Sequence, residues 1–179
     1  MRTRDELERL WSDMPPVPRG KGKVRLIVAR RTRGVHDVLE TAELSAELGV
    51  VGDRWHKDDG DPSHQVTIMI AHVARLVRAT PDQPLHTAGD NFFVHLDLSE
   101  EALPVGSRLR IGKALLEVTP APHLGCKKFR ARFGDGALAW VNHKDNRALR
   151  LRGINCRVIE PGMVSTGDDV IVTPPRPAE

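Results

Sequence analysis

The chain has 179 residues, of which 28% are charged and 40% hydrophobic, and its formal net charge is +3. This composition is typical of one globular domain and argues against intrinsic disorder. No apolar run approaches the ~18–20 residues that cross a bilayer, and the charged N-terminus lacks the apolar stretch of a secretory signal, so we expect no membrane partner. Two cysteines in unlike contexts argue against a disulfide framework and favour a reducing cytoplasm.

The first residues predict a helix followed by a linker. Leu7, Leu10 and Trp11 fall on one face of an amphipathic helix over residues 3–13. Prolines and glycines between positions 15 and 22 end this helix. The sequence therefore predicts a helix and linker over 1–20, ahead of a domain that covers 21–179.

Short strands dominate this second part. Alternating apolar residues predict a strand over 23–30 and a partner strand over 36–44. Further strands are predicted over 65–70, 91–98, 107–112, 114–121, 153–160 and 168–173, with a helix over 70–79 and two short helices, 127–134 and 137–143, broken by Gly134 and Gly136. Many short strands and few short helices predict a mainly-β fold, a closed or nearly closed barrel. We place the hairpin 108–120 at its centre and Cys126 at its mouth.

Positive charge is concentrated in one segment. Residues 123–157 hold nine Lys or Arg against two Asp, a net charge of +7. Such a segment favours a phosphate-bearing ligand, although a solvated face with cations at helix ends is an equal alternative. Nucleic acid is disfavoured because the chain has no Tyr, four Phe and three Trp, which leaves few platforms for bases.

Cys126 lies inside this segment, in the stretch "APHLGCKKFRARFG". Four cations follow it within six residues, and the residues after it are predicted to open a helix. Both features favour the thiolate, which is a good ligand for a soft transition metal and a good acceptor of sulfur. The alternative is an inert thiol in a tight turn. Cys156, in the strand "GINCRVIE", is predicted to fill the core.

Four stretches together resemble a known family. They are "LGVVGDRWHK" (48–57), "AGDNFFV" (88–94), "LPVGSRLRIGKALLEVTPAPHLGCKKFRARFG" (103–134) and "LRLRGINCRVIEPGMVSTGDDVIV" (149–172). In this order they resemble the MOSC domain, the module named after the C-terminal part of molybdenum cofactor sulfurase. The resemblance covers about residues 22–173, leaves 1–20 outside, and implies a β-barrel-like fold.

The resemblance also implies a chemistry. Cys126 matches the cysteine that family members use as a sulfur carrier or molybdenum ligand, so it is the predicted catalytic and metal-binding residue. The implied cofactor is the molybdenum cofactor, an anionic pterin. Residues predicted to contact it are Arg54, His56, Asn91, His123, Lys127, Lys128, Arg130 and Arg152.

The chain departs from the family pattern in two places. Asp90 and Phe92 stand where Glu and Leu are usual, and a direct catalytic role for Asp90 and a role in ordering its loop are equal alternatives. "PHLGC" replaces Pro-Arg-x-Pro-Cys, so His123 stands near the usual Arg and would make an anion contact pH-dependent.

Two functions remain open from the sequence. In the first, the chain holds the molybdenum cofactor through Cys126 and reduces N-hydroxylated compounds, with electrons from a separate electron-transfer protein. In the second, it carries sulfur as a Cys126 persulfide without a bound cofactor and takes the sulfur from a separate donor. The loop 50–65 is interpreted as solvated and acidic; His56 and His64 do not have the spacing of a closed zinc site.

Overall fold

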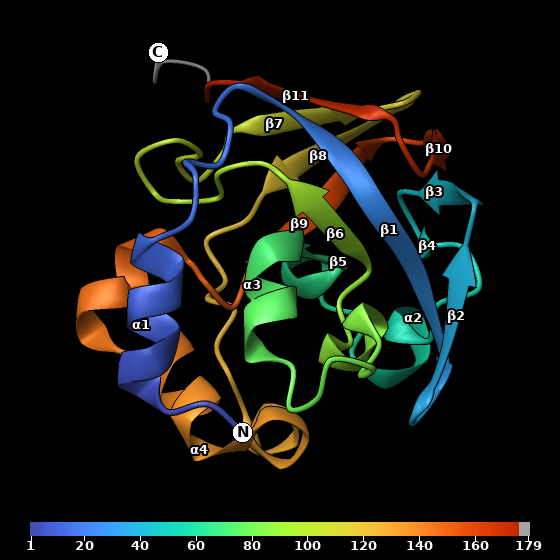
Figure 1. The fold of residues 1–179 in the computed structure, drawn as a ribbon. Coiled ribbons are helices and arrows are strands. Elements are labelled where there is room, and N and C mark those ends of the chain that lie inside the picture. The colour runs from blue at the N-terminus through green and yellow to red at the C-terminus, as the bar shows by residue number, and fades with distance from the viewer. Residues whose placement is uncertain (176–179) are drawn as a thin grey trace.

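Strands from distant parts of the chain close into a ring in the computed structural model, which describes residues 1–175 (Figure 1). Within these residues the ring has seven strands: β1 (Lys21–Thr32), β6 (Phe92–His95), β5 (Val66–Ile70), β9 (Ile154–Glu160), β8 (Ala114–Val118), β7 (Arg108–Ile111) and β11 (Asp169–Thr173), which pairs again with β1. Only β5 and β6 run parallel in this ring. The predicted β-barrel is confirmed, and the predicted hairpin is its β7–β8 pair.

β1 is the longest strand and holds the ring together. Its first residues pair with β11, its middle with β6 and its last residues with β2 (Val35–Leu39). Twelve residues suffice for three partners because a register shift between Val24 and Leu26 bends the strand. The C-terminal half of β1 continues past the residues that pair with β11 and stays paired with β2. Near its end, the Arg30 carbonyl accepts a hydrogen bond from Arg54 N in the loop 51–58.

The predicted strand over 36–44 is wrong. The chain forms β2, breaks at Glu40, and continues as β3 (Thr41–Ser45) in a second sheet with β10 (Gly162–Ser165) and β4 (Gly49–Val50). The reason is a change of partner: β2 pairs with β1, whereas β3 pairs with β10 and buries Ala42 and Leu44. Pro161 alone separates β9 from β10.

Helices cover one side of the barrel (Figure 1). α1 (Arg4–Ser12) confirms the predicted N-terminal helix and packs on α3 (Ala71–Val77) and α4 (Lys127–Val141). α4 is interrupted at Gly134, where φ is 89°, as predicted for a broken pair of helices. Shorter helical turns complete the fold: α2 (Trp55–Asp58), η1 (Pro62–His64), η2 (Leu85–Ala88) and η3 (Lys144–Leu149). None of the helices within residues 1–175 is long and apolar enough to cross a membrane.

One mouth of the barrel collects polar residues. β6 and β9 begin there, next to Thr67 near the start of β5, and β8 ends there at Val118. Asp90 and Asn91 immediately precede β6, and Arg152 and Gly153 immediately precede β9. These four residues are buried, so the topology brings polar groups from separate loops into one partly dry place.

Candidate functional site

Asp90 is the centre of a buried charged cluster at this mouth. Its Oδ1 lies 2.7 Å from His123 Nε2 and its Oδ2 lies 2.7 Å from Arg152 Nη1. Complete burial would raise the pKa of Asp90, but the charge of Arg152, together with His123, holds that pKa below its usual value. Asp90 is therefore a carboxylate that neutralises Arg152.

Arg152 is held from several directions. Its side chain is 8% exposed, its Nη2 donates to the carbonyl of Ala88, and its guanidinium lies 5.1 Å from the centre of the Phe129 ring. Its Nε is buried and has no hydrogen-bond partner among residues 1–175. An unpaired buried N–H is costly, so this atom is a place where a ligand could contribute an acceptor.

His123 is fixed in one tautomer by the same carboxylate. Because a carboxylate only accepts hydrogen bonds, His123 Nε2 carries the proton and Nδ1 holds a lone pair when the ring is neutral. Burial and the charge of Arg152 outweigh Asp90 and lower the pKa of His123. A Cβ on Gly153, whose φ is 114°, would lie 2.2 Å from the Ile68 carbonyl oxygen and 3.2 Å from His123 Cδ2, so only glycine lets the ring sit there.

A second buried cluster supports the loop 51–58. Arg30 binds the carboxylate of Asp53 with two nitrogens, at 2.8 and 2.9 Å, and Asp53 is 2% exposed. Asn91 donates to Asp53 Oδ2 at 2.9 Å and to the Val28 carbonyl, while its Oδ1 accepts from Thr67. The cluster joins β1, β5 and the start of β6, which fixes the backbone next to Asp90.

Cys126 is exposed and is the N-cap residue of α4, immediately before Lys127. Partial burial would raise the pKa of its thiol, but the backbone amides of Phe129 and Lys128, and then the charges of Arg152 and Lys128, lower it overall. The sulfur is not in full N-cap hydrogen-bonding geometry, so the amides act as nearby aligned dipoles. The Asn142 side chain fixes the backbone of Gly125, the residue before Cys126. It accepts a hydrogen bond from Gly125 N at 2.8 Å and donates one to Gly125 O at 2.9 Å.

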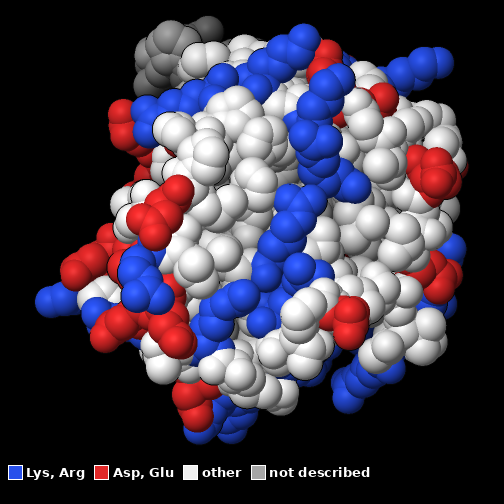
Figure 2. All heavy atoms as spheres, in the orientation of Figure 1, with Lys and Arg blue, Asp and Glu red and all other residues white. Residues whose placement is uncertain are grey.

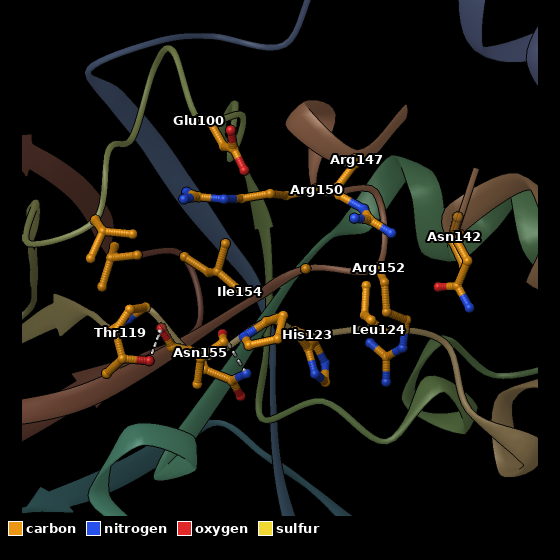
Figure 3. Close-up of a pocket in the computed structure, with 17 residues that line it drawn as sticks. Glu100, Thr119, His123, Leu124, Asn142, Arg147, Arg150, Arg152, Ile154 and Asn155 are labelled. Atoms are coloured by element: carbon orange, nitrogen blue, oxygen red, sulfur yellow. Dashed lines mark hydrogen bonds between the residues drawn. The ribbon is translucent and has the colours of Figure 1, made fainter. Parts of the chain in front are cut away.

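Two cavities lie on either side of the segment 122–124. The first, which we call the arginine pocket, has a volume of about 300 Å³ (Figure 3). It is lined by residues 118–124 and 152–155 together with Glu100, Val105, Val141, Asn142, Arg147 and Arg150. Figure 3 shows Glu100, Arg150 and Arg147 along one side and Thr119, Asn155 and His123 along the opposite side. Cys126 is not among the lining residues.

The second cavity, which we call the loop groove, is more open and has a volume of about 450 Å³. His123 lines both cavities, as do Pro122, Leu124 and Asn155. Arg54 lines the loop groove, pairs with Asp58 at 2.7 Å, and has a buried Nε without a partner in the described part of the chain. The remaining lining residues are Arg30, Trp55, Asp58, Asp59, His64 and Thr67.

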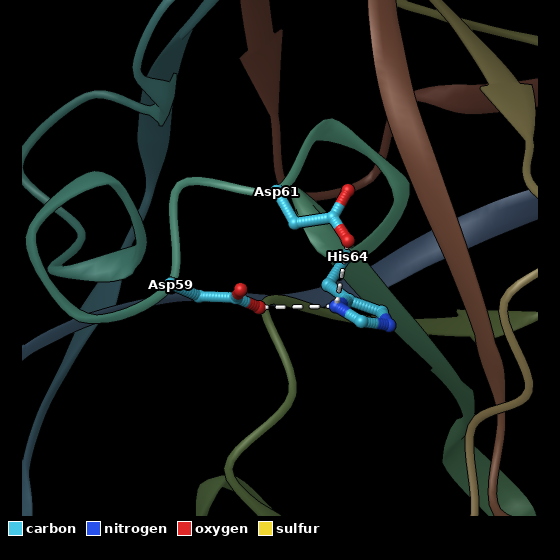
Figure 4. Close-up of side chains that lie close together, drawn as sticks. All are labelled: Asp59, Asp61 and His64. Carbon is cyan, nitrogen blue, oxygen red and sulfur yellow. Dashed lines mark hydrogen bonds and ion pairs between the residues drawn. The ribbon is translucent and has the colours of Figure 1, made fainter.

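Asp59, Asp61 and His64 meet at the outer edge of the loop groove (Figure 4). Their ligand atoms lie within 4.8 Å of one another, and His64 Nδ1 is 3.0 Å from Asp59 Oδ2. Both aspartates are exposed and already interact with the histidine, which agrees with the expected solvated acidic loop.

Comparison with known proteins decides the family. The family model for the MOSC domain matches residues 53–171. This chain belongs to the MOSC family. Similar solved structures include YuaD of Bacillus subtilis (21% identity, TM-score 0.59, covering 87% of this chain and 97% of that one) and YiiM of Escherichia coli (22%, 0.58, 88% and 72%). YiiM of Geobacillus stearothermophilus is also similar (12%, 0.56, 86% and 75%). A search of the curated proteins finds no match.

The MOSC barrel brings some of the predicted site residues together. His123 and Arg152 meet through Asp90, and Arg152 lies close enough to Cys126 for its charge to lower the thiol pKa. Lys127 and Lys128 are exposed in the first turn of α4, beside Cys126, and form no ion pair with other described residues. Arg54 reaches the neighbouring loop groove.

For other residues predicted to contact the cofactor, the geometry argues against such a contact. Asn91 is fully buried and its carboxamide is occupied by protein partners, so it supports the loop rather than facing a ligand. Arg130 pairs with Asp135 on the surface, and His56 is exposed on α2 and lines neither cavity. Burial, and then the charge of Arg152, lower the pKa of His123, which disfavours the charged ring that the expected anion contact requires.

Only part of the positively charged segment 123–157 lines a pocket. Arg147, Arg150 and Arg152 line the arginine pocket, but Arg157 pairs with Glu117 at an exposed position on β9. Figure 2 shows a second band of cations that crosses the face over β1 and α3. The exposed cations of these two elements include Lys23, Arg25 and Arg75, which lie outside the segment 123–157.

Sequence reasoning missed Arg30 and Asn142. Arg30 continues the spacing of Val24, Leu26 and Val28, so a charge at an inward position of β1 was a signal for a buried acid partner. Asn142 carried no such signal, because its contact with Gly125 depends on where α4 ends.

Proposed function

We propose that this MOSC protein binds the molybdenum cofactor with Cys126 as the metal ligand and reduces N-hydroxylated compounds. The observation that carries the proposal is the exposed thiol of Cys126, whose pKa is lowered by the amides of α4 and the charge of Arg152, at a barrel mouth with two cavities. A soft thiolate is the ligand type that such a metal prefers. When bound, the cofactor would supply two-electron redox chemistry.

The residues at the mouth fit an anionic, sulfur-bound group. Arg54 and Arg152 each have a buried Nε without a partner among residues 1–175, and both N–H groups need an acceptor. Lys127 and Lys128 are the exposed cations nearest in sequence to Cys126 and would hold the phosphate of the pterin. Arg152 would act as a hydrogen-bond donor rather than as a free charge, because Asp90 already neutralises it.

His123 would accept a hydrogen bond or a proton at the site. Breaking the N–O bond of an N-hydroxylated substrate takes up two electrons and two protons and releases the amine and water. The electrons come from a separate electron-transfer protein. Asp90 holds His123 Nε2–H, which leaves Nδ1 to accept a hydrogen bond or a proton from a group in either cavity.

Metal retention tests this function. The protein and its Cys126→Ser and Cys156→Ser variants are purified from a host that makes the cofactor, and molybdenum and released pterin are measured. We expect wild type and Cys156→Ser to retain both, and Cys126→Ser to lose them, because a hydroxyl is a weak ligand for this metal. Equal molybdenum in wild type and Cys126→Ser would contradict the proposal.

A sulfur-carrier function is the second candidate, and one observation favours it. The Cys126 sulfur is exposed and lines neither cavity, so a partner protein can reach it. In this reaction the Cys126 thiolate attacks the outer sulfur of a donor persulfide, a new S–S bond forms, the donor S–S bond breaks, and the donor thiolate leaves. A mass increase of one sulfur atom on Cys126, in protein that retains no molybdenum, would favour the carrier.

A further inference from the structure

We propose that the arginine pocket binds the substrate, and that the substrate is a singly charged organic anion with an apolar body whose carboxylate pairs with Arg147. The proposal deepens the proposed function, on which it rests for the chemistry at Cys126. The binding that it predicts can be measured without that chemistry.

The charges of the pocket select one negative charge. Asp90 neutralises Arg152 at 2.7 Å. Arg150 donates to the Leu103 carbonyl at 2.6 Å, and its charge is offset by Glu100, which lies near it on the same side of the pocket (Figure 3). Arg147 forms no ion pair or side-chain hydrogen bond within the described part of the chain, so one guanidinium is left uncompensated.

Arginine is suited to a carboxylate. Its planar fork donates two parallel hydrogen bonds to the two oxygens, which a lysine cannot do. A dianion such as a phosphate monoester would bring a second charge with no partner and would meet the carboxylate of Glu100 in the same pocket.

The walls of the pocket select an apolar body. The residues that line it include the apolar side chains Val105, Val118, Pro120 and Ile154. A volume of about 300 Å³ corresponds to about ten water molecules, which is enough for an aromatic ring with its substituents. Arg152 also lines the pocket, and its charge acts on the Cys126 thiol, so a ligand held here would lie next to the residue that links the pocket to Cys126.

Three small probes of matched size test the proposal: benzoate, the neutral benzamide, and phenyl phosphate. Binding is followed by calorimetry and by the rise in Tm that a ligand of the native state must produce. We expect benzoate to bind saturably, and benzamide and phenyl phosphate to bind about tenfold more weakly or worse. Benzamide has no charge to pair with the guanidinium, and phenyl phosphate has a second negative charge that one guanidinium cannot pair.

Variants locate the binding. Arg147→Gln should weaken benzoate about tenfold, to the level of benzamide, and leave benzamide unchanged. Lys144→Gln is the matched control, because Lys144 is an exposed cation on the same η3 helix and does not line the pocket. Ala121→Phe, which fills the pocket, should abolish binding of both probes.

Several results would overturn the proposal: no saturable benzoate binding, equal binding of benzoate and benzamide, tighter binding of phenyl phosphate, or unchanged benzoate binding in Arg147→Gln. Cys126→Ser separates this proposal from the proposed function. It should bind benzoate as wild type does, so a failure of molybdenum retention at Cys126 and a failure of the pocket appear in different measurements.

Discussion

At the scale of single residues, the two cysteines show how surroundings set the reactivity of one side chain. Cys126 is exposed, and backbone amides and nearby cations lower its pKa. Cys156 is fully buried in β9, and desolvation raises its pKa far above the ordinary value. Since the thiolate is the nucleophile, the two thiols should differ strongly in rate.

We therefore predict selective alkylation. With iodoacetamide near pH 7, the folded protein should be labelled at Cys126, while Cys156 reacts only after unfolding. Lys128→Gln should slow the labelling of Cys126, because Lys128 is one of the charges that lower its pKa. Peptide mass spectrometry over time measures both rates.

Two variants serve as controls for this prediction. Cys126→Ser should remove the fast reaction and keep the fold, whereas Cys156→Ser should keep the fast reaction and lose about 1–3 kcal/mol of stability, because it buries a hydroxyl in an apolar strand. Labelling of both thiols at one rate in folded protein would show that the surroundings of Cys126 do not activate it.

The two departures from the family pattern meet in space. Asp90 and His123 lie 33 positions apart in the chain, yet their side chains form one hydrogen bond of 2.7 Å. The sequence left two roles open for Asp90. The geometry favours ordering of the loop, since the carboxylate has no exposed surface and, within residues 1–175, its side chain hydrogen-bonds to the protein groups His123 and Arg152.

At the scale of elements, α1 is attached to the barrel by both apolar and polar contacts. Leu7 has no exposed surface and belongs to the main hydrophobic core. Glu8 accepts hydrogen bonds from Trp140 Nε1 and Asn146 Nδ2, both at 2.9 Å. A Cβ on Gly136 would lie 2.3 Å from the Arg2 carbonyl oxygen, so this glycine lets the N-terminus approach α4.

We predict that Leu7→Ala costs about 2–5 kcal/mol of unfolding free energy, the range for a buried leucine in a well-packed core. Arg9→Ala, on the exposed side of the same helix, should stay within about 0.5 kcal/mol of wild type. Urea denaturation measures both. If Leu7→Ala were as stable as Arg9→Ala, α1 would not share the core of the barrel.

At the scale of the whole molecule, buried titratable groups make stability depend on pH. His36, His72, His95 and His123 all have lowered pKa values, in each case chiefly through burial. In the unfolded chain such histidines take up protons at about pH 6.5, whereas in the folded protein they do so only at lower pH. Asp53 and Asp90 also have lowered pKa values. Their contribution to the free energy of unfolding is lost in a more acidic range, as pH falls from about 3.9, the unfolded value, through the pKa of each carboxyl in the folded protein.

We therefore predict that the free energy of unfolding falls as pH drops from near 7.5 to near 5.5, because the unfolded state binds more protons in this window. Urea midpoints at several pH values measure the slope. A double variant, His72→Gln with His95→Gln, should reduce it, since the two rings lie 5.0 Å apart beside Arg25 and Arg75 and resist protonation together. Equal or greater stability at the lower pH would refute the prediction.

The sequence by itself determined the local features of this protein. Alternation, turn residues and the positions of glycine were enough for most strands, the break in α4 and the β-barrel class, because these depend on near neighbours in the chain. The four motif stretches, taken in order, were enough to predict the MOSC family, which the family model over residues 53–171 confirms.

Tertiary structure decided which residues share a site. Whether Arg152 is a free cation or the partner of Asp90, and whether Asn91 faces a ligand or Asp53, depends on loops 24 to 62 positions apart meeting at the barrel mouth. The split of 36–44 into β2 and β3 likewise depends on two different partner strands. The pairing of Arg152 with Asp90 joins two loops that lie 62 positions apart, so no local pattern could reveal that this predicted cation was already occupied.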